Sequence, residues 1–178
     1  ARGGFIPVPL LDGPEPVLDI WAIASDKDGS VWVGTFGSGL FRLLPEGGVE
    51  QFKPKAGTTG LPDENVLALA FDAGGTLWIA TSSGIVLRHG GKFRAFDNSL
   101  LVSSVVVNLL PDLQGGMWLG TQAGLQRFNA DGVLETPSWT ADLSNPQIMG
   151  LLHERDGTPL FVAAKGINRL HAGRITQF

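Results

Sequence analysis

Short apolar runs alternate with glycine-rich turns along this chain, and the same order of runs and turns recurs four times. The first run of each copy is apolar at nearly every position: Ile20 to Ser25, Val66 to Phe71, Val106 to Pro111 and Ile148 to His153. Short apolar runs bounded by turn signals are typical of strands that are buried on both faces. No segment shows a convincing 3.6-residue period, so the sequence predicts an all-β protein.

A turn of fixed composition follows each first run. An acidic residue precedes a glycine by three positions in every copy: Asp26, Asp72, Asp112 and Glu154 precede Gly29, Gly75, Gly115 and Gly157. In such a hairpin the carboxylate accepts backbone N–H groups and the glycine supplies a positive φ. The second run then carries one column of large side chains: Trp32, Trp78, Trp118 and Leu160. We expect these side chains to wedge between neighbouring sheets.

The spacing of that column predicts the architecture. Its successive members are 46, 40 and 42 residues apart, and a period of roughly 40 to 50 residues with a glycine turn and an aromatic strand indicates β-propeller blades. The sequence therefore predicts a β-propeller arc of about four four-stranded blades, over residues 17–53, 65–97, 104–139 and 147–178 of one region, 1–178. Residues 1–16 are interpreted as the last strand of a preceding blade plus a linker, because Gly4 to Leu10 resembles an isolated fourth strand.

Four blades are the lower limit of the usual range, and an open arc leaves apolar blade faces exposed. The arc is therefore predicted to be a fragment of a larger propeller or to be closed by self-association. The chain opens at Ala1 without an initiator Met, which indicates an excised fragment or a processed product.

The outer parts of each predicted blade are also marked. The fourth strands are expected at Val49 to Lys53, Lys92 to Phe96, Val133 to Trp139 and Arg174 to Phe178. Long connectors rich in Pro, Gly, Ser and Asn follow three of them: Pro54 to Glu64, Asp97 to Ser104 and Pro137 to Pro146. All should emerge on one rim, where ligands usually bind. The third strands carry Arg42, Arg127 and Arg169 in one column. These arginines could bind an acidic ligand, but we expect them to pair with acidic residues of adjacent blades or to cover exposed sheet.

The repeat resembles the two-component regulator propeller repeat. The residues that carry the resemblance are Val31 to Thr35 with Gly39 to Arg42, Gly115 to Thr121 with Gly124 to Arg127, and the connector Gly60 to Pro62. The second copy departs from the pattern at Ala80 and Leu87, and the fourth lacks its Trp, Gly and Thr. The resemblance covers the chain from about Val17 to Phe178.

This resemblance implies the sensing part of a bacterial membrane receptor, usually periplasmic, followed by a membrane helix and a cytoplasmic output module such as a histidine kinase or a diguanylate cyclase. These 178 residues contain no kinase nucleotide motif, phosphoacceptor helix or cyclase signature. The function predicted is a non-catalytic sensory module that binds a small molecule or a protein. Periplasmic location follows from the resemblance, and a cytoplasmic location stays open.

Charge and hydropathy limit the classes of partner that the chain can bind. The net charge is −4 with both signs interspersed, which argues against nucleic acid, because such a partner needs a basic face. No run approaches the roughly 18 apolar residues of a membrane helix, so no membrane contact is predicted within the chain. The absence of cysteine excludes disulfides and thiol chemistry.

The sequence gives little support for a metal site. Asp26 to Gly29 resembles the start of a calcium loop, but the distal bidentate Glu is absent and the equivalents of Asp28 are Gly74 and Gln114. We interpret this segment as a turn. The three histidines show no metal-ligand spacing, so neither a metal nor a cofactor is predicted.

No catalytic constellation is recognisable, and three residues are candidates for ligand contact: Trp139, Asn108 and His153. Trp139 lies in a predicted rim segment, away from the structural Trp column. Asn108 and His153 lie on the first strands of two different blades, near the axial face of the propeller. Two alternatives stay open beside the sensory module. One is a fragment of a small propeller enzyme of the lyase or lactonase type, and the other is a protein-docking scaffold.

Overall fold

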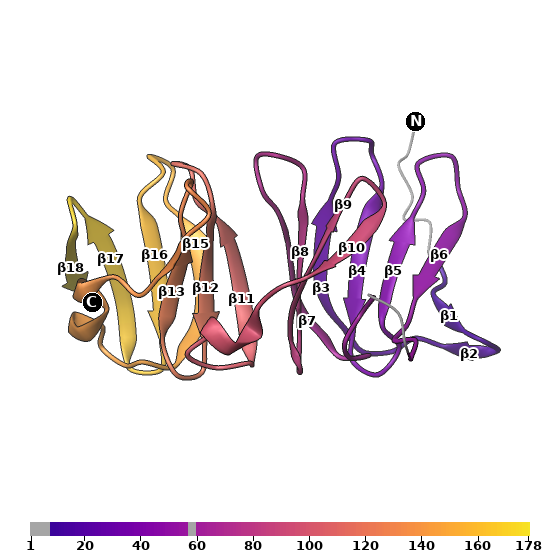
Figure 1. Cartoon of the computed structure of the whole chain (residues 1–178), viewed down its shortest axis with the longest axis horizontal. Coiled ribbons are helices and arrows are strands. Elements are labelled where there is room, and N and C mark those ends of the chain that lie inside the picture. Colours follow the sequence, from indigo (N-terminus) through magenta and orange to yellow (C-terminus); the bar gives the residue numbers. More distant parts are fainter. Residues whose placement is uncertain (1–7, 57–59) are drawn as a thin grey trace, which may run out of the picture.

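Four antiparallel sheets of four strands each make up most of the molecule (Figure 1). The computed structural model describes residues 8–56 and 60–178. Blade 1 contains β3 (Ile20–Ser25), β4 (Val31–Thr35), β5 (Leu40–Leu43) and β6 (Val49–Phe52); blade 2 contains β7 (Val66–Phe71), β8 (Leu77–Thr81), β9 (Gly84–His89) and β10 (Lys92–Ala95). Blade 3 contains β11 (Val106–Pro111), β12 (Met117–Thr121), β13 (Leu125–Phe128) and β14 (Leu134–Glu135); blade 4 contains β15 (Ile148–His153), β16 (Pro159–Ala163), β17 (Gly166–His171) and β18 (Arg174–Gln177). The predicted all-β propeller arc is confirmed.

Four short elements of the described residues lie outside the blades. The strands β1 (Leu11–Asp12) and β2 (Glu15–Pro16) form a small hairpin before blade 1. The 3-10 helices η1 (Asn98–Leu100) and η2 (Ser138–Asp142) lie in the connectors that follow blades 2 and 3.

The first strands of consecutive blades lie side by side, in the order β3, β7, β11, β15. Each blade thus turns one sheet face toward the preceding blade, here called its rear face, and one toward the next blade, here called its forward face. Figure 1 shows blades 1 and 4 at opposite ends of the molecule, so the described part of the chain is an open arc.

The Trp column holds adjacent blades together, as predicted. Trp32, Trp78 and Trp118 are all at most 4% exposed, and each lies on the forward face of its blade. Trp32 packs with Val66 and Ile79 of blade 2 in one apolar cluster. A Trp that buries roughly 150 to 250 Å2 contributes about 4 to 6 kcal/mol of hydrophobic free energy relative to an extended chain.

Glycine lets neighbouring blades approach one another closely at two of the junctions. A Cβ at Gly34 on β4 would lie 2.6 Å from Val66 Cγ1, and a Cβ at Gly120 on β12 would lie 2.7 Å from Ile148 Cγ2. The β-branched side chain that opens the first strand of the next blade therefore fills the space that the glycine leaves.

The first strand of blade 1 departs from the prediction of burial on both sides. Ile20 and Ile23 of β3 are 55% and 69% exposed, because no blade within residues 8–56 and 60–178 covers the rear face of blade 1 there. The outer half of that face is covered differently. Leu10 is buried against Val33 and Phe41, and Val17 packs beside it, so the segment around the β1–β2 hairpin replaces part of a preceding blade.

Two expected strands also differ. The predicted strand Gly4 to Leu10 lies largely outside the described residues, and Val8 to Leu10 belong to no strand. The fourth strand expected over Val133 to Trp139 is reduced to β14, and η2 begins at Ser138. Pro137 separates them, and because proline has no N–H it cannot extend the ladder.

Candidate functional site

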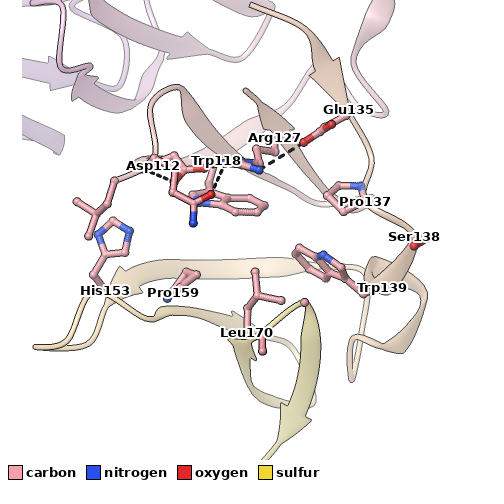
Figure 2. Close-up of a pocket in the computed structure, with 15 residues that line it drawn as sticks. Asp112, Trp118, Arg127, Glu135, Pro137, Ser138, Trp139, His153, Pro159 and Leu170 are labelled. Carbon is pink, nitrogen blue, oxygen red and sulfur yellow. Dashed lines mark hydrogen bonds and ion pairs between the residues drawn. The ribbon is translucent and has the colours of Figure 1, made fainter. Parts of the chain in front are cut away.

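A cleft of about 530 Å3 lies between blades 3 and 4 (Figure 2). Figure 2 shows Asp112, Trp118 and Arg127 of blade 3 on one side and His153, Pro159 and Leu170 of blade 4 on the other. The turns β11–β12, β15–β16 and β17–β18 also line it. In an up-and-down meander these turns lie at the end of the blades opposite the connectors. The cleft therefore lies mainly toward the rim other than the one expected from the sequence.

Arg127 organises the polar wall of the cleft. Its Nε donates to Asp112 Oδ2, its Nη2 donates to Gln114 Oε1 at 3.3 Å, and its Nη1 lies 3.6 Å from Glu135 Oε1. The Asp112 side chain is only 8% exposed. Three acceptors thus fix the guanidinium, which also lies 5.2 Å from the centroid of the Trp118 ring in a cation–π contact.

Aromatic rings form the floor of the cleft. Trp139 of η2 stacks on Phe161 of β16, with ring centroids 5.6 Å apart and planes 7° from parallel. Trp118 is tilted against both, at 5.8 Å from Trp139 and 5.4 Å from Phe161. Phe161 is fully buried, whereas Trp139 is half-buried and presents part of its surface to the cleft.

One polar atom of the floor has no partner. The Trp118 Nε1 is buried and, within the described residues, donates no hydrogen bond. Blade 2 differs, because there Trp78 Nε1 donates to Asp72 Oδ2 at 3.0 Å. In blade 3 the equivalent carboxylate, Asp112, is engaged by Arg127 instead. A buried N–H without an acceptor costs about 1 to 3 kcal/mol, so the pairing of Asp112 with Arg127 leaves Trp118 Nε1 with that cost.

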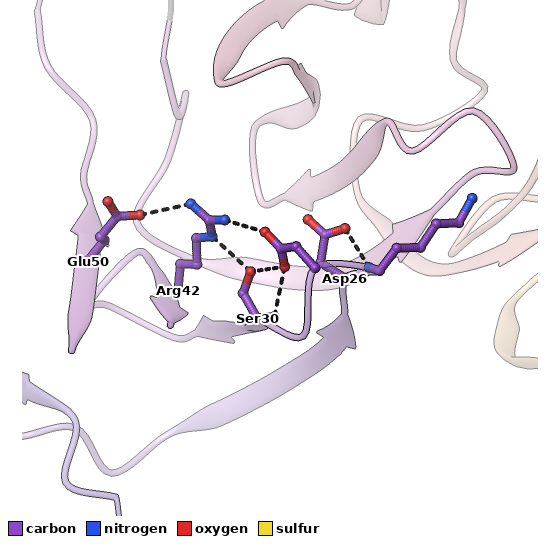
Figure 3. Close-up of polar contacts among 6 residues, drawn as sticks. Asp26, Ser30, Arg42 and Glu50 are labelled. Carbon is purple, nitrogen blue, oxygen red and sulfur yellow. Dashed lines mark hydrogen bonds and ion pairs between the residues drawn. The ribbon is translucent and has the colours of Figure 1, made fainter. Parts of the chain in front are cut away.

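The arginine column pairs within its own blade, which corrects the expectation of pairing across blades. Arg42 illustrates the pattern in blade 1: its Nη2 lies 2.6 Å from Asp28 Oδ2, its Nη1 lies 3.4 Å from Glu50 Oε2, and its Nε donates to Ser30 Oγ (Figure 3). Arg169 likewise contacts Glu154 and Asp156 of blade 4. The acids come from the first turn and the fourth strand, which flank the third strand on the same sheet.

The blade 1 network also sets protonation. Hydrogen bonds from the Ser30 side chain and backbone, and then from Arg42, lower the pKa of Asp28. Burial opposes the charge of Arg42, but its hydrogen bond with Asp28 and the nearby carboxylates raise the pKa of this guanidinium. Asp26 to Gly29 is therefore a turn, as interpreted from the sequence, and its Asp28 carboxylate binds Arg42.

The structure brings together two of the three residues expected at a site. Trp139 and His153 both line the cleft between blades 3 and 4. Asn108 does not: it lies in a shallow hollow of about 240 Å3 formed by the first strands of blades 1 to 3, with Trp21 and Leu69 among its neighbours.

Sequence reasoning missed the acceptors that hold Arg127. Glu135 lies directly opposite Arg127 on β14, as Glu50 lies opposite Arg42 on β6. In both blades the Glu follows the Arg by eight residues. That recurring spacing was the available signal for a cross-strand pair.

A second cleft, of about 820 Å3, lies at the equivalent place between blades 2 and 3. Its floor is the triad Trp78, Phe96 and Phe128, with centroid separations of 5.1 to 6.1 Å. Asp72 there is engaged by Trp78 rather than by an arginine. This cleft is more apolar, and it lacks the fixed guanidinium of the cleft between blades 3 and 4.

Within residues 8–56 and 60–178, no three His, Asp or Glu side chains gather closely enough to hold a metal ion. None of the helices in the described part of the chain has the length and apolar character needed to cross a bilayer.

The four-bladed arc with clefts between its sheets defines a β-propeller region. A family model described as two component regulator propeller matches residues 14–37 and 60–83. These stretches cover the start of blade 1 and the connector with the start of blade 2, and they are similar to the repeat that the sequence resemblance indicated. The third copy, which resembles the repeat as well as the first does, lies outside the matched stretches.

Solved structures share this fold. The extracellular domain of a hybrid two component system from B. thetaiotaomicron is 19% identical, with a TM-score of 0.71, over 83% of this chain and 21% of its own. Virginiamycin B lyase from Staphylococcus aureus is 18% identical, with a TM-score of 0.71, over 90% of this chain and 55% of its own. The chain thus spans about a fifth of the first protein and about half of the second. No curated protein matches the sequence.

Proposed function

We propose that this chain is a non-catalytic sensory region of a bacterial signal-transduction receptor and that the cleft between blades 3 and 4 is its ligand site. The observation that carries the proposal is the cleft itself, where a fixed guanidinium, Arg127, faces the half-buried ring of Trp139. The similarity of blades 1 and 2 to the two-component regulator propeller repeat supports the sensory part. The same family resemblance supports a periplasmic or extracellular position.

The lining defines the chemistry of the ligand. Trp139 offers a ring surface, which favours a ligand with one flat apolar face. Glu135 and Gln114 can accept or exchange hydrogen bonds at the edge of the cleft. A small molecule that combines a ring with hydroxyl, carbonyl or amide groups fits this set.

The position of the cleft suggests how binding is transmitted. Blade 4 packs on blade 3 through Trp118, Phe161 and Ile148. A ligand between the two blades contacts both, and it therefore favours one packing of blade 4 over others by its difference in affinity for them. The output domain that receives this change lies outside the 178 residues.

The test is a deletion in the intact receptor. When the segment that encodes residues 1–178 is removed in frame, receptor output should stop responding to the natural stimulus. The point variant Trp139→Ala should weaken the response, and Val133→Ser, an exposed position in the β13–β14 turn, should leave it unchanged. Unaltered responsive output after the deletion would contradict the sensory role.

An enzymatic role is the second candidate, because His153 lines the same cleft as Asp112 and Glu135 and the fold is shared with virginiamycin B lyase. The purified chain can be incubated with virginiamycin B and with simple lactones, with and without a chelator, and followed by mass spectrometry. Turnover that His153→Ala abolishes would establish catalysis and overturn the proposal. Intact substrate after long incubation supports a binding role.

A further inference from the structure

The cleft between blades 2 and 3 carries two cations that have no partner in the described part of the chain. Lys92 and Arg94 of β10 line this cleft on the side of blade 2, and both are exposed. Within residues 8–56 and 60–178, neither side chain forms an ion pair or donates a hydrogen bond. Arg127 differs, because three acceptors hold it in the cleft between blades 3 and 4. The cations of the second cleft are thus available to a ligand.

The strand register explains why no carboxylate lies opposite Arg94. In two other blades a third-strand arginine lies directly opposite a fourth-strand glutamate, in the pairs Arg42–Glu50 and Arg127–Glu135. In blade 2 the same two positions hold Leu87 and Arg94. The guanidinium of this blade therefore lies on the fourth strand rather than the third, and its cross-strand neighbour is apolar.

The acidic side chains that line this cleft are already engaged. Asp72 accepts hydrogen bonds from the Trp78 indole at 3.0 Å and from a backbone N–H at 2.9 Å. Asp97 accepts from the hydroxyl of Ser99 at 2.6 Å and from its backbone N–H at 3.2 Å. Because neither carboxylate pairs with a cation of the cleft, the positive charge there is not neutralised locally and favours an anion.

The same face of blade 2 carries the apolar floor of the cleft. Trp78, Leu87 and Arg94 lie opposite one another across β8, β9 and β10, so their side chains share one face of the sheet. Phe96 follows Arg94 by two residues, and its ring centroid lies 6.0 Å from that of Trp78 and 6.1 Å from that of Phe128. A ligand whose anionic group contacts Arg94 therefore has aromatic rings beside the rest of its surface.

We propose that the cleft between blades 2 and 3 is a second ligand site, which binds an aromatic carboxylate that has no amino group. Side chains two residues apart on a strand point to the same side, so one carboxylate can contact both Lys92 and Arg94. The ring of the ligand packs against Trp78 and Phe96. An ammonium beside the carboxylate, as in a free amino acid, is repelled by the same two cations.

This second site is separate from the cleft between blades 3 and 4. Its volume of about 820 Å3 lies within the usual range for small-molecule sites. Its cations and rings come from blade 2 and from the rear face of blade 3, whereas Trp139 and Arg127 belong to the other cleft. Binding here does not depend on a ligand there.

The first experiment compares probes that share an indole ring and differ in charge: the anion indole-3-propionate, its neutral amide and zwitterionic tryptophan. Titration calorimetry of the chain at low salt gives the Kd of each. The acid should bind at least about 10-fold more tightly than the amide or tryptophan, because it forms charge-assisted hydrogen bonds, and it should weaken as salt is added. Equal affinity of acid and amide, or no binding of the acid at millimolar concentration, would overturn the proposal.

Variants of exposed side chains test which residues bind the acid. Lys92→Gln and Arg94→Gln should each weaken binding of indole-3-propionate by about 3- to 10-fold and leave binding of the amide unchanged. Lys165→Gln, which removes an exposed lysine of blade 4, is the matched control and should leave both unchanged. Unaltered affinity for the acid in the double variant, Lys92→Gln with Arg94→Gln, would refute the assigned site.

The indole N–H signals of the 15N-labelled chain show which cleft is occupied. Trp78 lies in the floor of this cleft and Trp118 in the floor of the other. On addition of indole-3-propionate the Trp78 signal should shift and the Trp118 signal should not, and Trp139→Ala should bind the acid as the native chain does. A shift of Trp118 instead, with binding lost in Trp139→Ala, would overturn this proposal and leave the cleft between blades 3 and 4 as the ligand site.

Discussion

The indole nitrogen of Trp78 donates to the carboxylate of Asp72 at 3.0 Å. The third strand of this blade lacks the arginine that would otherwise engage the carboxylate. Blade 2 has Leu87 in the column where blades 1 and 3 have Arg42 and Arg127. Without an arginine beside it, the Asp72 carboxylate is open to the Trp ring. In blades 2 and 3 the turn acid therefore serves either the second-strand Trp or the third-strand arginine, whereas in blade 1 Arg42 pairs with Asp28 rather than with the turn acid Asp26.

The first prediction concerns stability. Asp72→Ala removes the acceptor of Trp78 Nε1 and of the Thr76 N–H, so it should lower the free energy of unfolding by about 1 to 3 kcal/mol. Asp131→Ala, at an exposed turn position, is the matched control, with an expected change within about 0.5 kcal/mol. Urea unfolding measures both, and equal effects would contradict the role assigned to Asp72.

The second prediction is the converse change in blade 3. Arg127→Leu recreates the arrangement of blade 2, and it should allow Trp118 Nε1 to donate to Asp112. The Trp118 indole N–H should then exchange its hydrogen with solvent more slowly. 15N-resolved nuclear magnetic resonance measures this exchange rate, with the Trp32 indole signal as internal reference. Exchange that stays as fast as in the native chain would show that the arginine does not decide the partner of the ring.

The third prediction tests the close approach of blades 1 and 2. Gly34→Ala places a Cβ 2.6 Å from Val66 Cγ1 and should destabilise the chain by about 1 to 3 kcal/mol through overpacking. Gly150→Ala is the matched control, because its Cβ would meet Val162 at an ordinary 3.6 Å. The double variant Gly34→Ala with Val66→Ala should cost less than the sum of its single changes, and simple additivity would contradict direct contact.

The fourth prediction is a stabilising change. Ala172 has a φ of 50° in the two-residue turn between β17 and β18, where blade 2 has Gly90 at 54°. Because left-handed backbone costs an L-residue about 1 to 2 kcal/mol, Ala172→Gly should raise the free energy of unfolding by about 0.5 to 1 kcal/mol after the greater chain entropy of glycine. Gly90→Ala should do the reverse, and a loss of stability in Ala172→Gly would refute the assigned turn.

The fifth prediction is a pH dependence in blade 1. The pKa of Asp28 is lowered from 3.8 by Ser30 and then by Arg42, so the ionised form stabilises the fold. This contribution is complete above pH 3.8 and is lost as pH falls below 3.8 through the lowered pKa. Thermal unfolding of Asp28→Asn and the native chain should therefore differ most near neutral pH and converge in acid, and a constant difference down to pH 2 would contradict the linkage.

The propeller arc was predictable because its signals are local. The Asp-to-Gly turn, the apolar first strand and the Trp column each specify a short element, and the period joins them into blades. The secondary structure of Val133 to Trp139 was not predictable in the same way. That segment carries strand-forming residues, but Pro137 ends the ladder and Trp139 is held by Phe161, which is remote in sequence.

The site was predictable only in part for a similar reason. Trp139 stood out because it left the Trp column, and it does line the cleft. The partners of the arginines were assigned to the wrong blade, because the eight-residue spacing from Arg to Glu recurs only in blades 1 and 3 and is a weak signal that Glu135 lies opposite Arg127. Asn108 has the right chemistry for a ligand contact, but its strand places it in the hollow near the axis, away from Trp139 and His153.

The most direct test of the account is ligand stabilisation of the cleft. Nucleosides, aromatic amino acids and monosaccharides, each combining a ring with polar groups, can be screened for a rise in the melting temperature of the native chain. A ligand at about 100 times its Kd adds about 2.7 kcal/mol, or about 5 to 10 °C for a domain of this size. The account predicts that the shift is lost in Trp139→Ala and kept in Trp21→Ala, whose ring lies at the other end of the arc. A compound that stabilises both variants as it does the native chain would contradict the assignment of the cleft as the ligand site.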